Sequence, residues 1–469
     1  MIYFFFVLWL AIAAATFFVK SRRAVHGLCG AYVAVHAIFA ERLFLRGAYL
    51  STSGQFFSFD EIGTLFYVLL AIVATFVIIH SKEYLKDDTL QDYKRYFALL
   101  MLLITAITGV YFANNIAITW ILMETTTLCA AGILYHRHSK DTLEATWKYL
   151  FVCSTGIAIA YLGILLLAAA ASNNSLNYEE LRTLITEGNP LYLKVAFVLI
   201  LTGYSCKMEI FPLYTVGVDA NYAAPAPASA FISTALVNAG FVSIYRIYSL
   251  YAAASEVFVW ARHLLILIGI LSLAVGAMFL RRTNNYKRFL SYSTVENMGI
   301  VAIGMGIGGV ALWAAVFHVM CHTLVKSSMF FQVGIMRHVY DSYSINRIGN
   351  YMNINRVGAI GFTLGTLVLL AFPPSPLFIS EVMIFSEIVS VGSWWLLIAM
   401  LILMCVVIYS IWGRSLRLGY HSNQDELHLS AVNRRLSYLA TVLLAVAIVV
   451  GVWQPDFVRD AIDVITNIE

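Results

Sequence analysis

The sequence predicts an all-α membrane protein with about 14 transmembrane helices. Apolar residues make up 61% of its 469 residues, and charged residues only 12%. A soluble domain contains roughly 45–50% apolar and about 25% charged residues, so this composition excludes a soluble globular enzyme. Basic and acidic residues number 30 and 26, and the resulting net charge of +4 gives no support to nucleic-acid binding.

Polar residues interrupt the apolar runs at regular intervals, which gives the positions of the expected helices. These helices cover 2–19, 25–44, 60–81, 96–113, 115–135, 147–170, 191–213, 227–251, 260–280, 290–307, 309–334, 356–387, 393–413 and 437–453. The first run lacks a basic segment and a small-residue cleavage site, so we expect a retained helix rather than a signal peptide.

Two of these helices are interrupted by proline. The first break contains Phe211-Pro212 and leads into a linker that ends at Pro227, and the second spans 372–376. Proline removes a backbone donor, and in lipid the freed groups must be buried in protein or line a wet cavity. Two breaks in corresponding halves of a chain favour an inverted-repeat transport architecture, with the seventh and twelfth helices discontinuous.

Basic residues concentrate in alternate loops. The loops after odd-numbered helices carry 21 Lys and Arg residues, the opposite loops carry 7, and Lys207 and Lys326 lie inside apolar segments. Because cytoplasmic loops are enriched in Lys and Arg, we expect both termini on the outer, periplasmic side of a bacterial or archaeal cytoplasmic membrane.

The six cysteines stand singly in apolar segments and form no Cys-x-x-Cys pair. This pattern gives no iron–sulfur, haem or zinc motif, so we expect no cofactor bound by this chain and interpret the cysteines as small apolar packing residues.

Glu124 and Lys207 are two charges deep within apolar segments. An ionised side chain at mid-bilayer costs about 2.5–3.5 kcal/mol on insertion scales, so its presence needs a reason. A Glu124–Lys207 pair would make the proton affinity of the lysine depend on the carboxylate, as a proton-pumping switch requires. A purely structural ion pair is the alternative.

The segment 309–334 carries His318, His322 and Lys326 at a spacing of four residues. This spacing places all three on one helix face over about 12 Å, which suits a proton relay. Histidines satisfied by neighbouring hydroxyls are the structural alternative. A metal site is disfavoured because the third group is lysine.

Other charged residues allow two interpretations. Glu381, beyond the second break, is either the proton acceptor at the end of the path or a half-helix capping charge. Glu144 and Lys148 form either a proton-uptake funnel or a plain helix pair. Solvated or interfacial positions are expected for Glu209, Asp219 and Glu296, which lie nearer the ends of their segments, and Asp60 is expected to cap a helix.

These residues, in this order, resemble the antiporter-like subunits of respiratory complex I and its relatives. The resemblance covers roughly residues 60–420 and rests on five motifs. In the first half these are Trp120-Ile-Leu-Met-Glu124, and Lys207 with Phe211-Pro212-Leu213 and the linker 219–227. In the second half they are Lys287-Arg-Phe-Leu-Ser-Tyr-Ser-Thr294 with Glu296-Asn-Met-Gly299, Phe317-His318 through His322 to Lys326, and Phe372-Pro373 to Glu381. Glu296-Asn-Met-Gly and Glu144-Ala-Thr-Trp-Lys-Tyr-Leu look most like the branch of membrane-bound group 4 nickel–iron hydrogenases, hydrogenase-4 component F.

The resemblance implies inverted repeats of five helices, at 96–252 and 253–413, between an N-terminal segment 1–95 and a C-terminal segment 414–469. It implies that Glu124 and Lys207 form the switching pair, that Lys326 is the central relay residue near His318 and His322, and that Glu381 ends the path. Several relatives have a His or Lys in the eighth helix. Here, 227–251 offers hydroxyl and amide groups instead, including Ser233 and Asn238, so hydroxyls or waters would have to connect Lys207 to Lys326.

The resemblance also implies partners. Other integral membrane subunits would bind the chain in the bilayer, and nickel–iron and iron–sulfur centres would reside in soluble hydrogenase subunits. The same residues suit a subunit of an Mrp-type cation/proton antiporter or of an inorganic-carbon uptake complex. A stand-alone solute transporter and a structural scaffold are further alternatives.

Overall fold

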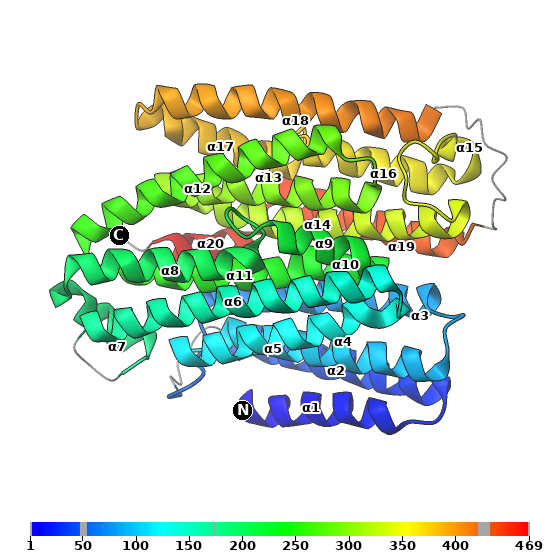
Figure 1. The fold of residues 1–469 in the computed structure, drawn as a ribbon, viewed down its shortest axis with the longest axis horizontal. Helices are drawn as coiled ribbons and strands as arrows, with labels where there is room; N and C mark the ends of the chain where they lie inside the picture. Colours follow the sequence, from blue (N-terminus) through cyan, green and yellow to red (C-terminus); the bar gives the residue numbers. More distant parts are fainter. Residues whose placement is uncertain (1, 47–53, 172–174, 421–431, 468–469) are drawn as a thin grey trace.

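The protein is a polytopic all-α membrane protein, as the composition predicts. The computed structural model describes residues 2–46, 54–171, 175–420 and 432–467, and its secondary structure is helical apart from isolated β-bridges. Figure 1 shows the long helices side by side, running along the longest axis of the molecule, with both termini toward the same end. Eleven helices in the described residues are long and apolar enough to cross a membrane, and α1 and α16 are shorter apolar helices.

The first half of the chain runs from α1 to α11. Its helices are α1 (Ile2–Phe18), α2 (Arg22–Arg46), α3 (Glu61–Tyr84), α4 (Leu90–Phe112), α5 (Ile116–Leu134), α6 (Lys140–Ala170), α7 (Tyr178–Leu184), α8 (Pro190–Met208), α9 (Thr215–Ala223), α10 (Ala226–Phe231) and α11 (Val237–Tyr251). A π-helical segment, Ile232–Leu236, joins α10 to α11, so the eighth predicted helix contains a local widening that its sequence did not reveal.

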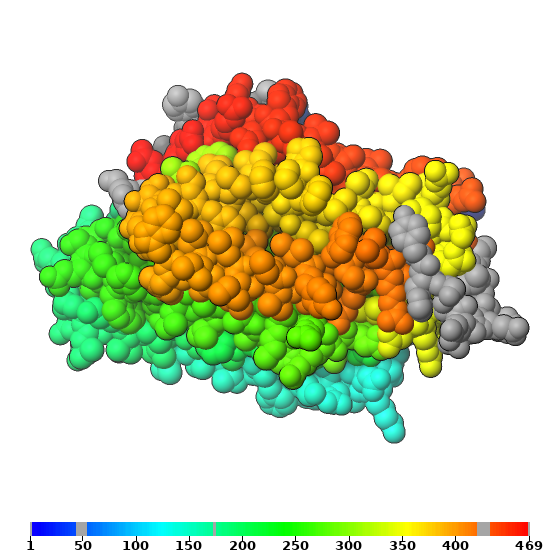
Figure 2. Space-filling view, turned by 90° about the horizontal axis from the view of Figure 1, so that it is seen from above, coloured from blue at the N-terminus to red at the C-terminus, as the bar shows by residue number. Residues whose placement is uncertain are grey.

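The second half runs from α12 to α20. Its helices are α12 (Ser255–Arg282), α13 (Tyr286–Ile307), α14 (Gly309–Tyr340), α15 (Tyr351–Ile354), α16 (Arg356–Leu369), α17 (Pro376–Ser390), α18 (Trp394–Tyr420), α19 (Arg434–Trp453) and α20 (Asp456–Thr466). Figure 2 shows α17 and α18 covering one face, with the C-terminal helices along its edge. The exposed side chains of α18 on the molecule's surface include Trp394, Trp395 and Tyr409.

Both predicted breaks are present, and each begins a few residues earlier than expected. The helix expected at 191–213 ends at Met208, and the segment expected at 356–387 is two helices, α16 and α17. Helix α20, which the sequence analysis missed, is amphipathic and buries Val458, Ile462 and Ile465. It packs against α3 and α14, and the indole of Trp313 donates a hydrogen bond of 2.7 Å to Asp463.

The two halves contain the same local hydrogen-bond pattern. Asn115 caps α5 by accepting from two amides of the first turn, and Asn285 caps α13 in the same way. Asn115 forms an isolated antiparallel bridge with Asn177, and Asn285 forms one with Ser344. A pattern repeated at the starts of α5 and α13 is what an internal structural repeat predicts.

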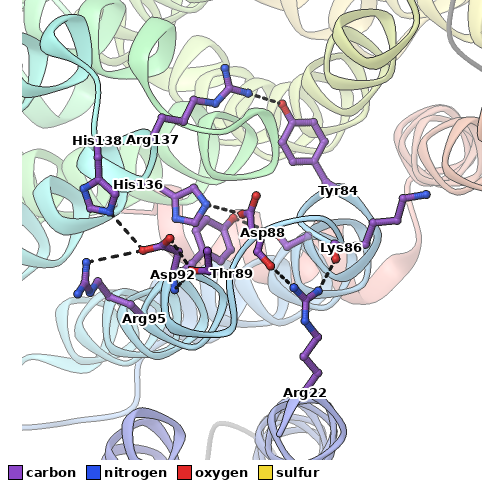
Figure 3. A network of polar contacts seen from close by, with 12 residues as sticks. Arg22, Tyr84, Lys86, Asp88, Thr89, Asp92, Arg95, His136, Arg137 and His138 are labelled. Carbon is purple, nitrogen blue, oxygen red and sulfur yellow. Dashed lines mark hydrogen bonds and ion pairs between the residues drawn. The ribbon is translucent and has the colours of Figure 1, made fainter. Parts of the chain in front are cut away.

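A polar network joins the loops at the end of the bundle that holds the α1–α2 turn (Figure 3). The guanidinium of Arg22 donates to two main-chain carbonyls of the α3–α4 loop. His136 contacts the carboxylate of Asp88 at 2.7 Å, and Arg137 donates to the hydroxyl of Tyr84 at 3.1 Å. These contacts connect the α5–α6 turn to the α3–α4 loop and to the start of α2.

Arg246 of α11 anchors the opposite end of the same helices. Its side chain is 7% exposed and pairs with Asp60 at 2.8 Å, while it also donates to the main-chain carbonyls of Tyr111 and Ala113. Asp60 caps α3 by accepting from the amide of Gly63, which confirms its predicted role. One arginine therefore joins the start of α3, the end of α4 and α11.

Replacing Asp60 with asparagine is expected to destabilise the bundle. Asparagine is also a good helix cap, so Asp60→Asn removes the negative charge beside Arg246 while the start of α3 is preserved. We expect a loss of about 1–3 kcal/mol, measured as a lower midpoint of thermal unfolding in detergent. Asp460→Asn on the exposed face of α20 is the control. Equal midpoints for the two variants would contradict the anchoring role.

Candidate functional site: a buried row of ionisable groups

Ionisable and polar side chains form a buried row through the interior of the helix bundle. The row begins with side chains of α5, α6 and α8, passes the π segment between α10 and α11, and continues with α13, α14 and α17. Helix α14 is its central element, because α13, α17, α10 and the π segment all pack against it. Most of the predicted site residues lie in this row.

Lys207 is near the end of α8, directly before the first break, and its side chain is 2% exposed. Its ammonium donates to the hydroxyl of Thr127 at 2.8 Å and to that of Tyr149 at 3.2 Å. The carboxylate of Glu124 instead accepts from the hydroxyl of Ser154 at 2.6 Å. Among the described residues, no salt bridge within 4.0 Å joins Lys207 to Glu124.

The predicted direct ion pair is therefore wrong for this conformation. Thr127 lies one helical turn after Glu124 on α5, so it takes the contact with Lys207 that the carboxylate was expected to make. The sequence analysis missed Thr127, Tyr149 and Ser154, whose one signal is a hydroxyl within an apolar helix. The switching role of Glu124 and Lys207 remains a prediction.

Lys326 lies at the centre of α14 and is fully buried. Its ammonium donates to the main-chain carbonyl of Leu290 on α13 at 2.6 Å. His322, one turn away, is also buried, and its Nε2 atom has no hydrogen-bond partner. Within the described part of the chain, no three His, Cys, Asp or Glu side chains are grouped to hold a metal ion.

His318 is connected to two neighbouring helices. One ring nitrogen lies 2.9 Å from the hydroxyl of Ser380 on α17, and the other lies 3.0 Å from the amide oxygen of Asn297 on α13. The amide nitrogen of Asn297 donates to Glu296 at 2.6 Å. Asn297 thus connects the histidine to a carboxylate. The sequence analysis overlooked it, although it is the residue after Glu296 in the Glu-Asn-Met-Gly motif.

The prediction that Glu209 and Glu296 occupy solvated or interfacial positions is wrong, because both are buried. Their side chains are 1% and 2% exposed, respectively. Helix α13 is enclosed by neighbours over nearly its whole length, so Glu296 is interior, and the turn at the end of α8 directs Glu209 inward. Glu381 is also buried, at 4% exposed, next to Ser380.

Hydroxyl and amide groups of the π segment and α11 connect to α13 and α14. Ser233 lies 2.9 Å from Thr294, and Asn238 accepts from the hydroxyl of Thr323 at 3.0 Å. The region that lacks a titratable group in the eighth predicted helix thus contains polar side chains in contact with one another.

Three predicted residues lie at the surface. Glu144 and Lys148 pair at 2.6 Å and are 67% and 58% exposed, and Asp219 pairs with Arg288 at 3.2 Å. All four line one hollow of about 300 Å³. The solvated position expected for Asp219 is confirmed, and the hollow brings Asp219 together with Glu144 and Lys148.

The fold and the buried row together define a polytopic membrane protein with ionisable groups along its interior. Residues 113–408 match the family described as NADH:quinone oxidoreductase/Mrp antiporter, transmembrane, and the chain belongs to this family. It is 27% identical over 347 residues to a hydrogenase-4 component F homolog of Methylacidiphilum infernorum, with 71% of this chain and 73% of that protein covered.

A second relative is Na(+)/H(+) antiporter subunit A1 of Staphylococcus aureus. It is 25% identical over 338 residues, which cover 69% of this chain but only 41% of that longer protein. The fold is similar to chains in an archaeal membrane-bound sulfane sulfur reductase (TM-score 0.85, 21% identity, 99% and 98% coverage) and in the Mrp complex of Dietzia sp. DQ12-45-1b (TM-score 0.85, 14% identity, 99% and 96% coverage).

Replacing Asn297 with leucine is expected to disconnect His318 from Glu296. Leucine has a similar size, but it leaves a buried ring nitrogen and a buried carboxylate oxygen without these partners, at a cost of about 1–3 kcal/mol each. We expect a lower thermal unfolding midpoint for the Asn297→Leu protein in detergent, relative to Asn353→Leu at an exposed position. An unchanged midpoint would show that water replaces the amide.

Proposed function

We propose that this protein translocates protons across the membrane as an antiporter-like subunit of a redox-driven complex, of the membrane-bound hydrogenase or NADH/quinone oxidoreductase type. The observation that carries the proposal is the environment of Lys326. This lysine is fully buried, and within the described residues it forms no ion pair inside 4.0 Å. An ammonium in such a position costs free energy, and a lysine that can lose its proton avoids that cost.

The buried row supports a path for the proton. Glu144 and Lys148 would collect protons at the surface hollow, and Lys207 would receive them at the first break. Lys326 would pass them to His318 and Glu381 at the second break. The direction of transfer would be set by a conformational or electrostatic change in a partner.

The partners in this proposal are other integral membrane subunits and, through them, soluble hydrogenase and iron–sulfur subunits. The exposed aromatic residues of α18 are suited to lipid or to a neighbouring membrane subunit. The nickel–iron centre and iron–sulfur clusters would supply the electron transfer from those partners. This chain would contribute the membrane path, in a cytoplasmic membrane with both termini outside.

A cation/proton antiporter subunit is the second candidate function. It is favoured by the similarity to Na(+)/H(+) antiporter subunit A1 and to a chain of an Mrp complex. In this case a sodium or potassium gradient would drive the proton through the same row. The two candidates differ in the driving reaction and not in the residues that carry the proton.

Lys326→Met is expected to abolish translocation while the complex still assembles. Methionine fills a similar volume and cannot bind a proton, and loss of one proton-transfer group lowers a rate by about a hundredfold or more. Proton uptake is measured in inverted native-membrane vesicles by quenching of a ΔpH-sensitive dye. The vesicles are driven in turn by hydrogen, by reduced ferredoxin, by NADH, and by sodium or potassium pulses.

Lys140→Met, at the exposed first position of α6, is the matched control and is expected to retain wild-type uptake. Wild-type uptake in Lys326→Met vesicles would overturn the relay role of Lys326. Uptake driven by hydrogen, ferredoxin or NADH, together with co-purified nickel–iron or iron–sulfur subunits, supports the redox-driven proposal. Uptake that follows sodium or potassium alone replaces it with the antiporter.

A further inference from the structure

We propose that Glu209 is a proton-relay group between Lys207 and Lys326, an inference that rests on the proposed function and adds a residue to its path. Glu209 is two positions after Lys207, at the break between α8 and α9. Without Glu209, a proton would have to pass the π segment through hydroxyl groups alone. Three features of its surroundings support this role.

The first feature is the backbone. Glu209 is the C-cap of α8, with φ of 57° and ψ of 38°, in the left-handed region. Helices most often place glycine at a left-handed C-terminal position, because a side chain there is strained. A glutamate that remains in this conformation is expected to have a role that depends on its carboxyl group.

The second feature is the space made for the carboxyl group. Gly217 on α9 faces Glu209 so closely that a Cβ at this position would lie 2.4 Å from three atoms of the glutamate side chain, including its carboxyl carbon. Any larger residue at position 217 would displace the carboxyl group. Gly217 therefore belongs to the same arrangement as Glu209.

The third feature is the incomplete hydrogen bonding of the carboxyl group. Asn221 donates to Oε1 at 3.0 Å, whereas Oε2 is buried and has no partner. A structural carboxylate in a membrane interior is expected to have both oxygens satisfied. An oxygen left free, beside a donor that holds the other in place, is suited to accept and release a proton.

Glu209 is two residues from Lys207 along the chain and interacts electrostatically with Lys326. Its charge acts on Tyr149, which accepts a hydrogen bond from Lys207, and on Lys326. In the proposed step, the ammonium of Lys207 gives its proton to the carboxylate of Glu209. The protonated Glu209 then gives that proton to the neutral amine of Lys326 and returns to the carboxylate form.

The test compares Glu209→Gln with Glu256→Gln, which removes an exposed carboxylate at the start of α12. Glutamine retains the size of the side chain and an oxygen that accepts from Asn221, but it cannot carry the proton. In native-membrane vesicles of the assembled complex, we expect Glu209→Gln to lower proton uptake by about tenfold or more and Glu256→Gln to leave it unchanged.

A second readout does not depend on translocation. Infrared difference spectra of the purified complex, recorded across a pH titration in H₂O and D₂O, detect the carbonyl band of a protonated carboxyl group. We expect a band that responds to pH in the wild type and is absent from Glu209→Gln. Uptake at the wild-type rate in Glu209→Gln, or an infrared band that is unchanged by this substitution, would overturn the relay role.

Glu209→Asp separates a relay from a structural cap if Glu209→Gln lowers the yield of complex. Glu209→Asp retains a titratable carboxyl group, so a relay predicts partial recovery of uptake per assembled complex, whereas a cap predicts the same loss as for glutamine. Gly217→Ala is expected to lower uptake as well. If the wild type transports protons under none of the drivers, the proposed function fails, and the infrared band alone decides whether Glu209 exchanges its proton.

Discussion

The structure depends on how free backbone groups are satisfied at the first helix break. In a membrane interior, an amide without a partner costs several kcal/mol, so a break is tolerated only where other groups take over its hydrogen bonds. Here, two serine hydroxyls accept hydrogen bonds from the amides that the break leaves free. The hydroxyl of Ser272 on α12 accepts from the amide of Phe211 at 2.9 Å, and the hydroxyl of Ser205 on α8 accepts from the amide of Leu213 at 3.4 Å. This support holds Lys207 and Glu209 at a fixed, buried place in the bundle.

The second break uses a different solution for the same constraint. Ser375 caps α17 by accepting from the amide of Phe378, and the amide of Phe372 bonds back to the carbonyl of Leu367 on α16. Helix α17 can therefore start within the bundle and present Ser380 to His318 on α14. Both breaks thus bring a helix end to the buried row, where a proton-carrying path needs polar groups that continuous apolar helices do not supply.

The sequence predicted the membrane fold, both breaks and the residues of α14, because each leaves a strong signal. Long apolar runs, prolines within them and charges at a spacing of four residues are all local patterns. The predictions that failed concern tertiary packing. Whether Glu209 and Glu296 face solvent depends on which helices surround α8 and α13, and whether Lys207 meets Glu124 or Thr127 depends on the rotation of α5. The amphipathic α20 was overlooked because the search was for long apolar runs.

The corrected positions of the two glutamates change the composition of the proposed proton path. With lysines and histidines alone, every buried titratable group between Lys207 and His318 would be a base, and two neighbouring protonated bases would repel each other. Glu209 and Glu296 add two buried carboxyl groups whose charges both act on Lys326. In the proposed path, a proton on Lys326 would be stabilised by these carboxylates, and when Lys326 is neutral one of the carboxyl groups could hold the proton instead. Along this path, carboxyl groups among the bases would keep the net charge of the row low at each step, which is the condition for moving a proton through a medium that does not tolerate isolated charge.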